Sequence, residues 1–164
     1  LLQYATAKIG VIMVNINPAY RTSELIYVIN QSGISFIFAA PEFKSSNYKK
    51  MIDDAREFTE TLRKEVYWGD SWERFLENGK KVTDEKLLSF EEKVQFDDPV
   101  NIQYTSGTTG NPKGVTLSHH NILNNAYFIG IRMNYTEKDR VCIPVPFYHC
   151  FGMVIGLQPS FRKV

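Results

Sequence analysis

Cysteine is scarce in this chain, which has two cysteines among 164 residues. Cys142 and Cys150 cannot build a disulfide scaffold, and their small number fits a reducing compartment, so we expect a cytoplasmic protein. The cysteines and the three histidines, His119, His120 and His149, match no zinc-ligand spacing. The sequence therefore predicts no metal site built from its own side chains.

An excess of charge of one sign is also missing. The chain has 19 basic and 18 acidic residues, for a net charge of +1. This balance predicts no nucleic-acid partner and no attachment to an anionic membrane surface. Long hydrophobic runs are absent as well, because Pro144, Pro146 and His149 interrupt the most apolar stretch, residues 141–157, so we expect no transmembrane segment. Residues 1–6 lack the basic start of a signal peptide.

The remaining composition is typical of a soluble globular domain, with 43% hydrophobic and 23% charged residues. Apolar runs and amphipathic stretches alternate as in α/β folds, and no linker divides the chain. Lys80–Asp98 is polar and is expected to form an irregular surface segment. The patterns predict strands at 11–16, 34–40, 99–104, 115–117 and 140–145. They also predict helices at 1–8, 22–32 with Thr22 as its cap and Gly33 as its end, 48–62, 71–79, and 119–129 with Ser118 as its cap.

A loop rich in glycine, serine and threonine, residues 104–114, follows the expected strand at 99–104. Small residues let backbone N–H groups approach phosphate oxygens, hydroxyls add donors, and a lysine adds positive charge. The Walker A pattern fails here, because Gly107 and Gly110 are too close together, Lys113 does not follow Gly110, and Gly114 replaces the Ser or Thr that would hold magnesium. The loop is predicted to bind phosphate in another way.

Residues 104–115, Tyr-Thr-Ser-Gly-Thr-Thr-Gly-Asn-Pro-Lys-Gly-Val, resemble without a gap the AMP-binding signature of the adenylate-forming superfamily. This superfamily includes acyl-CoA synthetases, luciferases and the adenylation domains of peptide synthetases. Residues 144–152 and the upstream residues 14–25 are similar to further elements of the family, with a leaning towards fatty-acyl-CoA synthetases of medium- to long-chain type. The resemblance implies an α/β fold with stacked sheets flanked by helices, as part of the large N-terminal domain.

The resemblance also implies a reaction and its substrates. A fatty-acid carboxylate attacks the α-phosphorus of ATP, pyrophosphate leaves, and CoA then attacks the acyl-adenylate and releases AMP. ATP, Mg²⁺, CoA and a fatty acid are the implied cofactors and partners. The residues implied to bind the ATP phosphates are Thr105, Ser106, Gly107, Thr108, Thr109, Gly110 and Lys113.

The second group of candidate residues surrounds His149. A histidine among aromatic residues is most often a packed core residue, but the resemblance implies that His149 lines the acyl site near the α-phosphate and takes part in catalysis. The residues implied to shape the acyl pocket are Phe147, Tyr148, His149, Phe151 and Gly152. The four neighbours of His149 suit a core position nearly as well. Tyr104 either packs under the phosphate loop or contacts the nucleotide.

Several family elements are missing from residues 1–164: a Tyr-Gly-x-Thr-Glu segment whose Glu would bind magnesium, an Asp for the ribose hydroxyls, and a C-terminal domain with a lysine. Residues 157–164 also depart from the apolar helix expected there. We therefore expect residues 1–164 to form a partial AMP-binding domain without the C-terminal domain, inactive alone and self-associating through apolar surface. Two alternatives stay open, an aryl or amino acid adenylation enzyme and a non-catalytic nucleotide-binding or interaction module.

Overall fold

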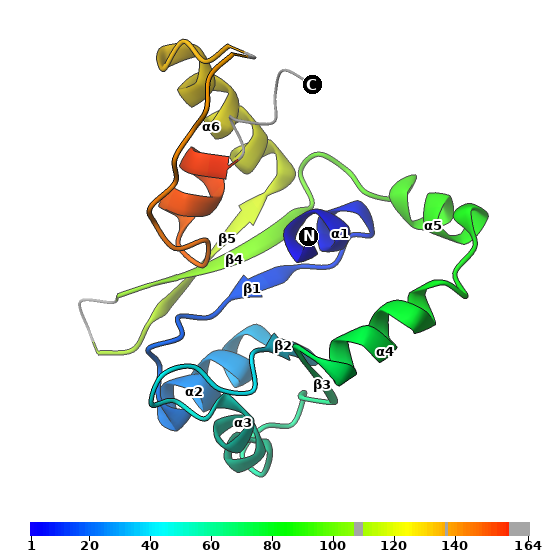
Figure 1. The fold of residues 1–164 in the computed structure, drawn as a ribbon, viewed down its shortest axis with the longest axis vertical. Helices are drawn as coiled ribbons and strands as arrows, with labels where there is room; N and C mark the ends of the chain where they lie inside the picture. The colour runs from blue at the N-terminus through cyan, green and yellow to red at the C-terminus, as the bar shows by residue number, and fades with distance from the viewer. Residues whose placement is uncertain (107–109, 137, 158–164) are drawn as a thin grey trace. The chain divides into compact units, whose positions relative to one another are not determined.

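The computed structural model describes residues 1–106, 110–136 and 138–157, and it has the expected mixed α/β character (Figure 1). The strands are β1 (Met13–Asn15), β2 (Phe36–Ala39), β3 (Lys64–Tyr67), β4 (Pro99–Thr105) and β5 (Lys113–Ser118). The helices are α1 (Leu2–Lys8), α2 (Thr22–Ser32), α3 (Tyr48–Arg56), α4 (Asp70–Gly79), α5 (Asp84–Glu91), α6 (His119–Arg132) and the π-helix η1 (Phe151–Leu157).

The chain divides into two compact units, and neither is a continuous stretch of sequence. The first contains Leu1–Asn17, Phe90–Thr105 and the chain from Gly114 onward, and the second contains Pro18–Ser89 with the segment that begins at Ser106 and ends at Lys113. Each unit has its own sheet: β1-β4-β5 in the first and β2-β3 in the second.

In the first unit, the central strand β4 pairs with a strand from the start of the chain. β1 runs parallel to β4, with Met13 opposite Asn101 and Asn15 opposite Gln103. Beside this sheet lies a buried apolar cluster that joins β4, α6 and η1, and its members are Val100, Ile122, Met153 and Val154. Figure 1 shows α6 and η1 side by side, so the segment after α6 is tied back to the sheet.

Helix α6 begins where the sequence predicted. Ser118 adopts an extended backbone, and its Oγ accepts a hydrogen bond of 3.2 Å from the backbone N–H of Asn121. The Asn121 side chain in turn accepts from the Ser118 N–H at 2.9 Å, so the two residues form a reciprocal N-terminal cap. This cap sets the direction of α6 immediately after β5.

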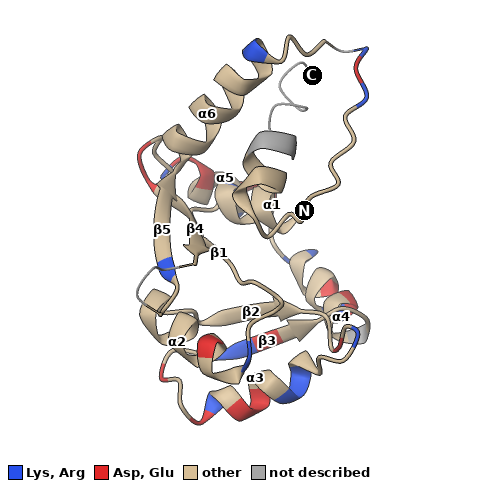
Figure 2. Ribbon diagram, turned by 90° about the vertical axis from the view of Figure 1, so that its left-hand side faces the viewer, with Lys and Arg blue, Asp and Glu red and all other residues tan. Residues whose placement is uncertain are grey.

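The second unit is a small parallel α/β arrangement. β2 and β3 pair in parallel, with Phe36 opposite Lys64, and α3 provides the crossover that two parallel neighbours require. α3 packs on α2 and contains both acidic and basic residues (Figure 2). Of these, Lys49, Lys50, Asp53 and Asp54 are exposed. The helix α2 ends at Gly33, whose φ of 65° is the left-handed conformation expected of a closing glycine. The buried residues of this unit are Leu25, Val28, Ile29, Ile34, Ile37, Ile52, Ala55, Leu62 and Val66.

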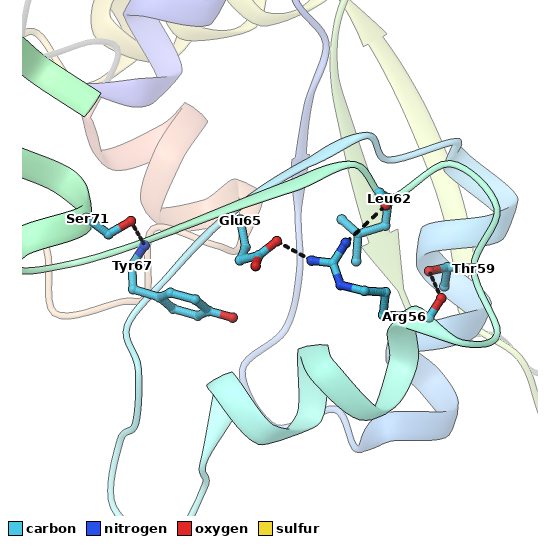
Figure 3. A network of polar contacts seen from close by, with 6 residues as sticks. All are labelled: Arg56, Thr59, Leu62, Glu65, Tyr67 and Ser71. Carbon is cyan, nitrogen blue, oxygen red and sulfur yellow. Dashed lines mark hydrogen bonds and ion pairs between the residues drawn. The ribbon is translucent and has the colours of Figure 1, made fainter. Parts of the chain in front are cut away.

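An ion pair connects the end of α3 to β3 (Figure 3). The Arg56 guanidinium bonds the Glu65 carboxylate through one nitrogen and the Leu62 carbonyl, at 3.4 Å, through another. Both charged side chains are partly exposed, so the pair is screened by water and contributes modestly to stability. Its role is geometric, because it holds the chain between α3 and β3 in one conformation.

Three predicted element boundaries and one predicted strand were wrong. The strand expected at 11–16 is limited to the three residues that pair with β4, and Val11 and Ile12 are 47% and 40% exposed. The helix expected at 48–62 ends at Arg56, and Leu62 is buried outside any helix. Thr22 is the first residue of α2, and the Arg21 N–H bonds the Glu24 carboxylate at 2.9 Å in the capping position. No strand forms at 140–145, where Pro144 lacks the N–H that a sheet requires.

Two elements were missed. β3 has one strongly buried residue, Val66, which follows two charged residues. No apolar run therefore marks this strand in the sequence. Residues 64–67 form a strand because they pair with β2. α5 lies inside the stretch expected to be irregular. Its signal was local: Asp84 and Glu85 occupy the first turn, where acidic residues favour the helix dipole, and the Thr83 hydroxyl accepts from the Lys86 N–H at 3.3 Å.

Tyr67 on β3 yields a prediction about pH and stability. Its hydroxyl is buried without a hydrogen-bond partner, and burial, followed by the charges of Glu65 and Asp53, raises its pKa to about 12. An unfolded tyrosine ionises near about pH 10. The contribution of Tyr67 to stability is therefore complete below about pH 10 and is lost as the pH rises through the folded-state pKa.

We expect Tyr67→Phe to flatten the loss of stability between about pH 10 and pH 12, measured as the urea midpoint across that range. Tyr27→Phe is the control for removing a tyrosine, because the Tyr27 hydroxyl already accepts a hydrogen bond of 2.8 Å from Gln31. Equal pH slopes for the wild type and Tyr67→Phe would contradict the prediction.

Candidate functional site

The predicted phosphate loop connects adjacent strands of the first sheet, since Thr105 ends β4 and Lys113 begins β5. Thr105, Ser106 and Lys113 are exposed, as a phosphate-binding segment requires. Gly110 has a φ of 98°, a conformation that side chains other than glycine rarely adopt. Gly107, Thr108 and Thr109 lie outside the described residues.

Gly114, the residue after Lys113, allows a close approach between β5 and β4. A β-carbon at this position would lie 3.2 Å from Ile102 Cγ2 and 3.2 Å from Tyr104 Cζ. The ring of Tyr104 thus lies against the β5 backbone. Whether Tyr104 also packs under the phosphate loop or contacts the nucleotide stays a prediction.

His149 begins the helical turn that leads into η1. Its Nδ1 accepts a hydrogen bond of 3.1 Å from the Phe151 backbone N–H, and its carbonyl accepts from the N–H groups of Gly152 at 3.0 Å and Met153 at 3.1 Å. His149 therefore acts as an N-terminal cap through its ring. A backbone N–H can only donate, so Nδ1 is the acceptor and the neutral ring carries its proton at Nε2. His149 is exposed.

Gly152 is held by backbone contacts. A β-carbon there would lie 2.4 Å from the Pro146 carbonyl oxygen and 2.9 Å from that of Val145. No side chain fits into this space without moving the backbone at residues 145 and 146. Gly152 therefore brings the start of η1 against the preceding segment, which fixes the turn that carries His149.

The aromatic neighbours of His149 are not core residues. Phe147, Tyr148 and Phe151 are 54%, 37% and 50% exposed. This exposure removes the alternative of a packed core for these three side chains. Their assignment to an acyl pocket stays a prediction.

Sequence analysis missed a group of buried amides in the first unit. Asn101 is fully buried, and Asn15 and Gln103 are 7% and 6% exposed. The Gln103 amide donates to the Asn101 side chain at 2.8 Å, and the Asn101 amide donates to the Gln3 side chain at 3.3 Å. The available signal was a pair of amides two positions apart in β4, Asn101 and Gln103, which alternate with Val100 and Ile102.

The candidate residues fall in different units. Thr105 and residues 147–152 belong to the first unit, and Ser106, Gly110 and Lys113 belong to the second. Across the described parts of the chain, the His, Cys, Asp and Glu side chains form no group of three or more that could hold a metal ion. Within the same parts, every helix is too short or too polar to cross a bilayer.

Comparison with known proteins agrees with the fold and the loop. The profile of the family described as "AMP-binding enzyme" matches residues 1–163. A medium-chain acyl-CoA ligase, ACSF2, of Danio rerio mitochondria is 39% identical over 177 residues, which cover 95% of this chain and 29% of that protein. The acyl-CoA ligase sidI of Aspergillus fumigatus is 33% identical over 166 residues, covering 94% of this chain and 28% of that protein.

Solved structures show the same architecture. The inhibitor-bound N-terminal domain of FACL13 from Mycobacterium tuberculosis has a TM-score of 0.72 at 26% identity, over 99% of this chain and 39% of that one. ATP-bound MatB from Rhodopseudomonas palustris has a TM-score of 0.70 at 23% identity, over 97% of this chain and 30% of that one.

The fold is thus the α/β fold found in the N-terminal domains of adenylate-forming acyl-CoA ligases. The chain belongs to the AMP-binding enzyme family. It spans about three-tenths of the length of the curated relatives it matches, 29% and 28% for the two named above.

Gly152→Ala tests the backbone contact that supports the His149 turn. Because the added methyl group would overlap the Pro146 carbonyl, we expect the free energy of unfolding to fall by about 3 kcal/mol, at the upper end of overpacking effects. Urea denaturation measures this change. Gly79→Ala is the matched control, because a β-carbon there meets nothing within 4 Å and should raise stability by about 0.5 kcal/mol. Similar stabilities for the two variants would show that residues 145–146 move aside.

Proposed function

We propose that this chain supplies the ATP-phosphate loop and part of the acyl site of an AMP-forming fatty-acyl-CoA ligase. The observation that carries the proposal is the unbroken signature at residues 104–115, located between two adjacent strands of an AMP-binding fold. The reaction joins a carboxylate to the α-phosphorus of ATP with loss of pyrophosphate. CoA thiolate then attacks the acyl carbon and AMP leaves.

The central physical difficulty of this reaction is that a carboxylate must approach a polyanion. Donors fixed in the loop offset phosphate charge and hold the reacting groups in line. In our proposal, Thr105, Ser106, Gly107, Thr108, Thr109 and Gly110 contribute hydroxyl and backbone N–H donors to the leaving phosphates, and Lys113 contributes positive charge. None of these groups is a nucleophile, so the loop binds and positions ATP.

His149 serves as a hydrogen-bond donor in this proposal. Since Nδ1 is occupied by the Phe151 N–H, the ring offers Nε2–H, which suits an oxygen of the fatty-acid carboxylate or of the α-phosphate. A neutral donor at this point stabilises negative charge and leaves the carboxylate ionised for attack. The exposed rings of Phe147, Tyr148 and Phe151 and the backbone at Gly152 would border the acyl chain.

Mg²⁺ enters the proposal as the companion of ATP. The described His, Cys, Asp and Glu side chains form no group of three or more that could hold a metal, so we assign no residue of this chain to the ion. CoA is likewise proposed as a substrate of the whole enzyme. The substrate class rests on relatives whose names include a medium-chain acyl-CoA ligase.

ATP binding is the part of the function that this chain can test directly. We expect the 164-residue chain to bind Mg·ATP saturably in isothermal titration, and Lys113→Ala to weaken binding about tenfold through loss of a charged contact. Lys80→Ala, which removes an exposed lysine on another element, is the control for net charge. Equal losses in the two variants would assign the effect to general electrostatics and contradict the role of Lys113.

The complete reaction is tested by exchange of labelled pyrophosphate into ATP. With dodecanoate and Mg²⁺, we expect the isolated chain to show no acid-dependent exchange, because it spans only about three-tenths of its relatives' length. Exchange above the acid-free background would mean that the loop and the His149 turn suffice for adenylation. Exchange with benzoate but not dodecanoate would favour an aryl-acid enzyme.

A further inference from the structure

The buried amides of the first unit include one that reaches the helix carrying His149. Asn15 lies opposite Gln103 in the β1–β4 register, and its side-chain nitrogen lies 3.8 Å from the thioether sulfur of Met153. Both residues are buried, at 7% and 2% exposure. The contact joins the start of the chain to η1 across 138 positions of sequence.

This contact has a direct backbone link to His149. The Met153 N–H donates to the His149 carbonyl at 3.1 Å, in the first turn that the His149 ring caps. Met153 therefore belongs to the same turn in which Nδ1 accepts from the Phe151 N–H. Met153 also packs with Val100, Ile122 and Val154. Met153 thus makes both apolar contacts with this cluster and a polar contact with Asn15.

The chemistry of the pair explains why a methionine suits this position. A buried amide N–H without an acceptor is costly, and a thioether is a weak acceptor that an aliphatic side chain of similar volume lacks. A hydrogen bond to a thioether sulfur is weak. It is nevertheless directional, whereas apolar packing is not. The pair can thus determine where along the sheet the η1 turn sits.

We propose that Asn15 is a positioning residue for His149, acting through Met153. The Asn15–Met153 contact holds the first turn of η1 in the position in which the His149 ring is a cap and its Nε2–H is presented outward. The inference rests on the proposed function in one respect: the ring that Asn15 positions is taken to be a hydrogen-bond donor in the acyl site. Its structural content concerns the tautomer and orientation of one ring.

The test is the tautomer of His149 in the 164-residue chain, observed by NMR after ¹⁵N-histidine labelling at mildly alkaline pH. His149→Gln identifies the signals. We expect the wild-type ring to carry its proton at Nε2, and Met153→Leu to produce a mixture of tautomers, because the turn is no longer held in one position. Met153→Leu should also lower the folding equilibrium constant about tenfold, since the Asn15 N–H loses its acceptor.

Controls separate positioning from general loss of stability. Asn101→Ala removes the bonds to Gln3 and Gln103 at a fully buried position and keeps both partners of the Asn15–Met153 contact, so it should lower stability and leave the His149 tautomer unchanged. If that variant does not fold, Gln3→Ala removes the outer bond of the same group at a less buried position.

Two results would overturn the proposal: an unchanged Nε2–H signal in Met153→Leu, or equal tautomer mixing in Met153→Leu and in whichever control folds. Neither readout requires ATP or a fatty acid. A failure of ATP binding or of pyrophosphate exchange would therefore count against the proposed function alone.

Discussion

The pairing of β1 with β4 is the constraint on which the first unit depends. It joins residues near 14 to residues near 102, and the long intervening segment, Pro18–Ser89, folds as the core of a separate unit. The pairing brings Asn15 beside Gln103 and gives β4 a partner on the side away from β5. β4 in turn is the strand that leads into the candidate phosphate loop. The loop thus starts from a central strand, which is a rigid support for a ligand site.

The same unit shows how one side chain can serve both structure and chemistry. One nitrogen of His149 caps a helical turn, which leaves the other as a donor. A helix cap satisfies a backbone N–H that would otherwise lack a partner, so structural need selects the tautomer. Gly152 adds a steric limit, because its backbone packs against Pro146 too closely for a side chain. Together these local constraints make the orientation of the ring a property of the fold.

The predictions that succeeded were those with a local physical cause. Ser118 caps α6 and Gly33 closes α2 because hydrogen bonding and backbone conformation act within a few residues. Residues 140–145 failed because their apolar character fits a strand, whereas Pro144 prevents pairing. β3 was missed for the opposite reason, since its charged residues conceal a strand that exists through its partner β2. For the candidate site, the sequence marked the loop and His149 but not Asn15 or Asn101.

The sequence by itself determined the family and the identity of the candidate phosphate-binding residues, because the signature at 104–115 is contiguous and its chemistry is readable without coordinates. Only the tertiary structure decided which nitrogen of His149 is available, that Tyr104 lies against Gly114, and that buried amides link β1, β4 and η1. The amide contacts join residues far apart in the chain, whereas the His149 hydrogen bond spans two residues and the Tyr104–Gly114 contact lies between neighbouring strands. No periodicity or spacing encodes the amide contacts, because they depend on the register in which β1 and β4 pair.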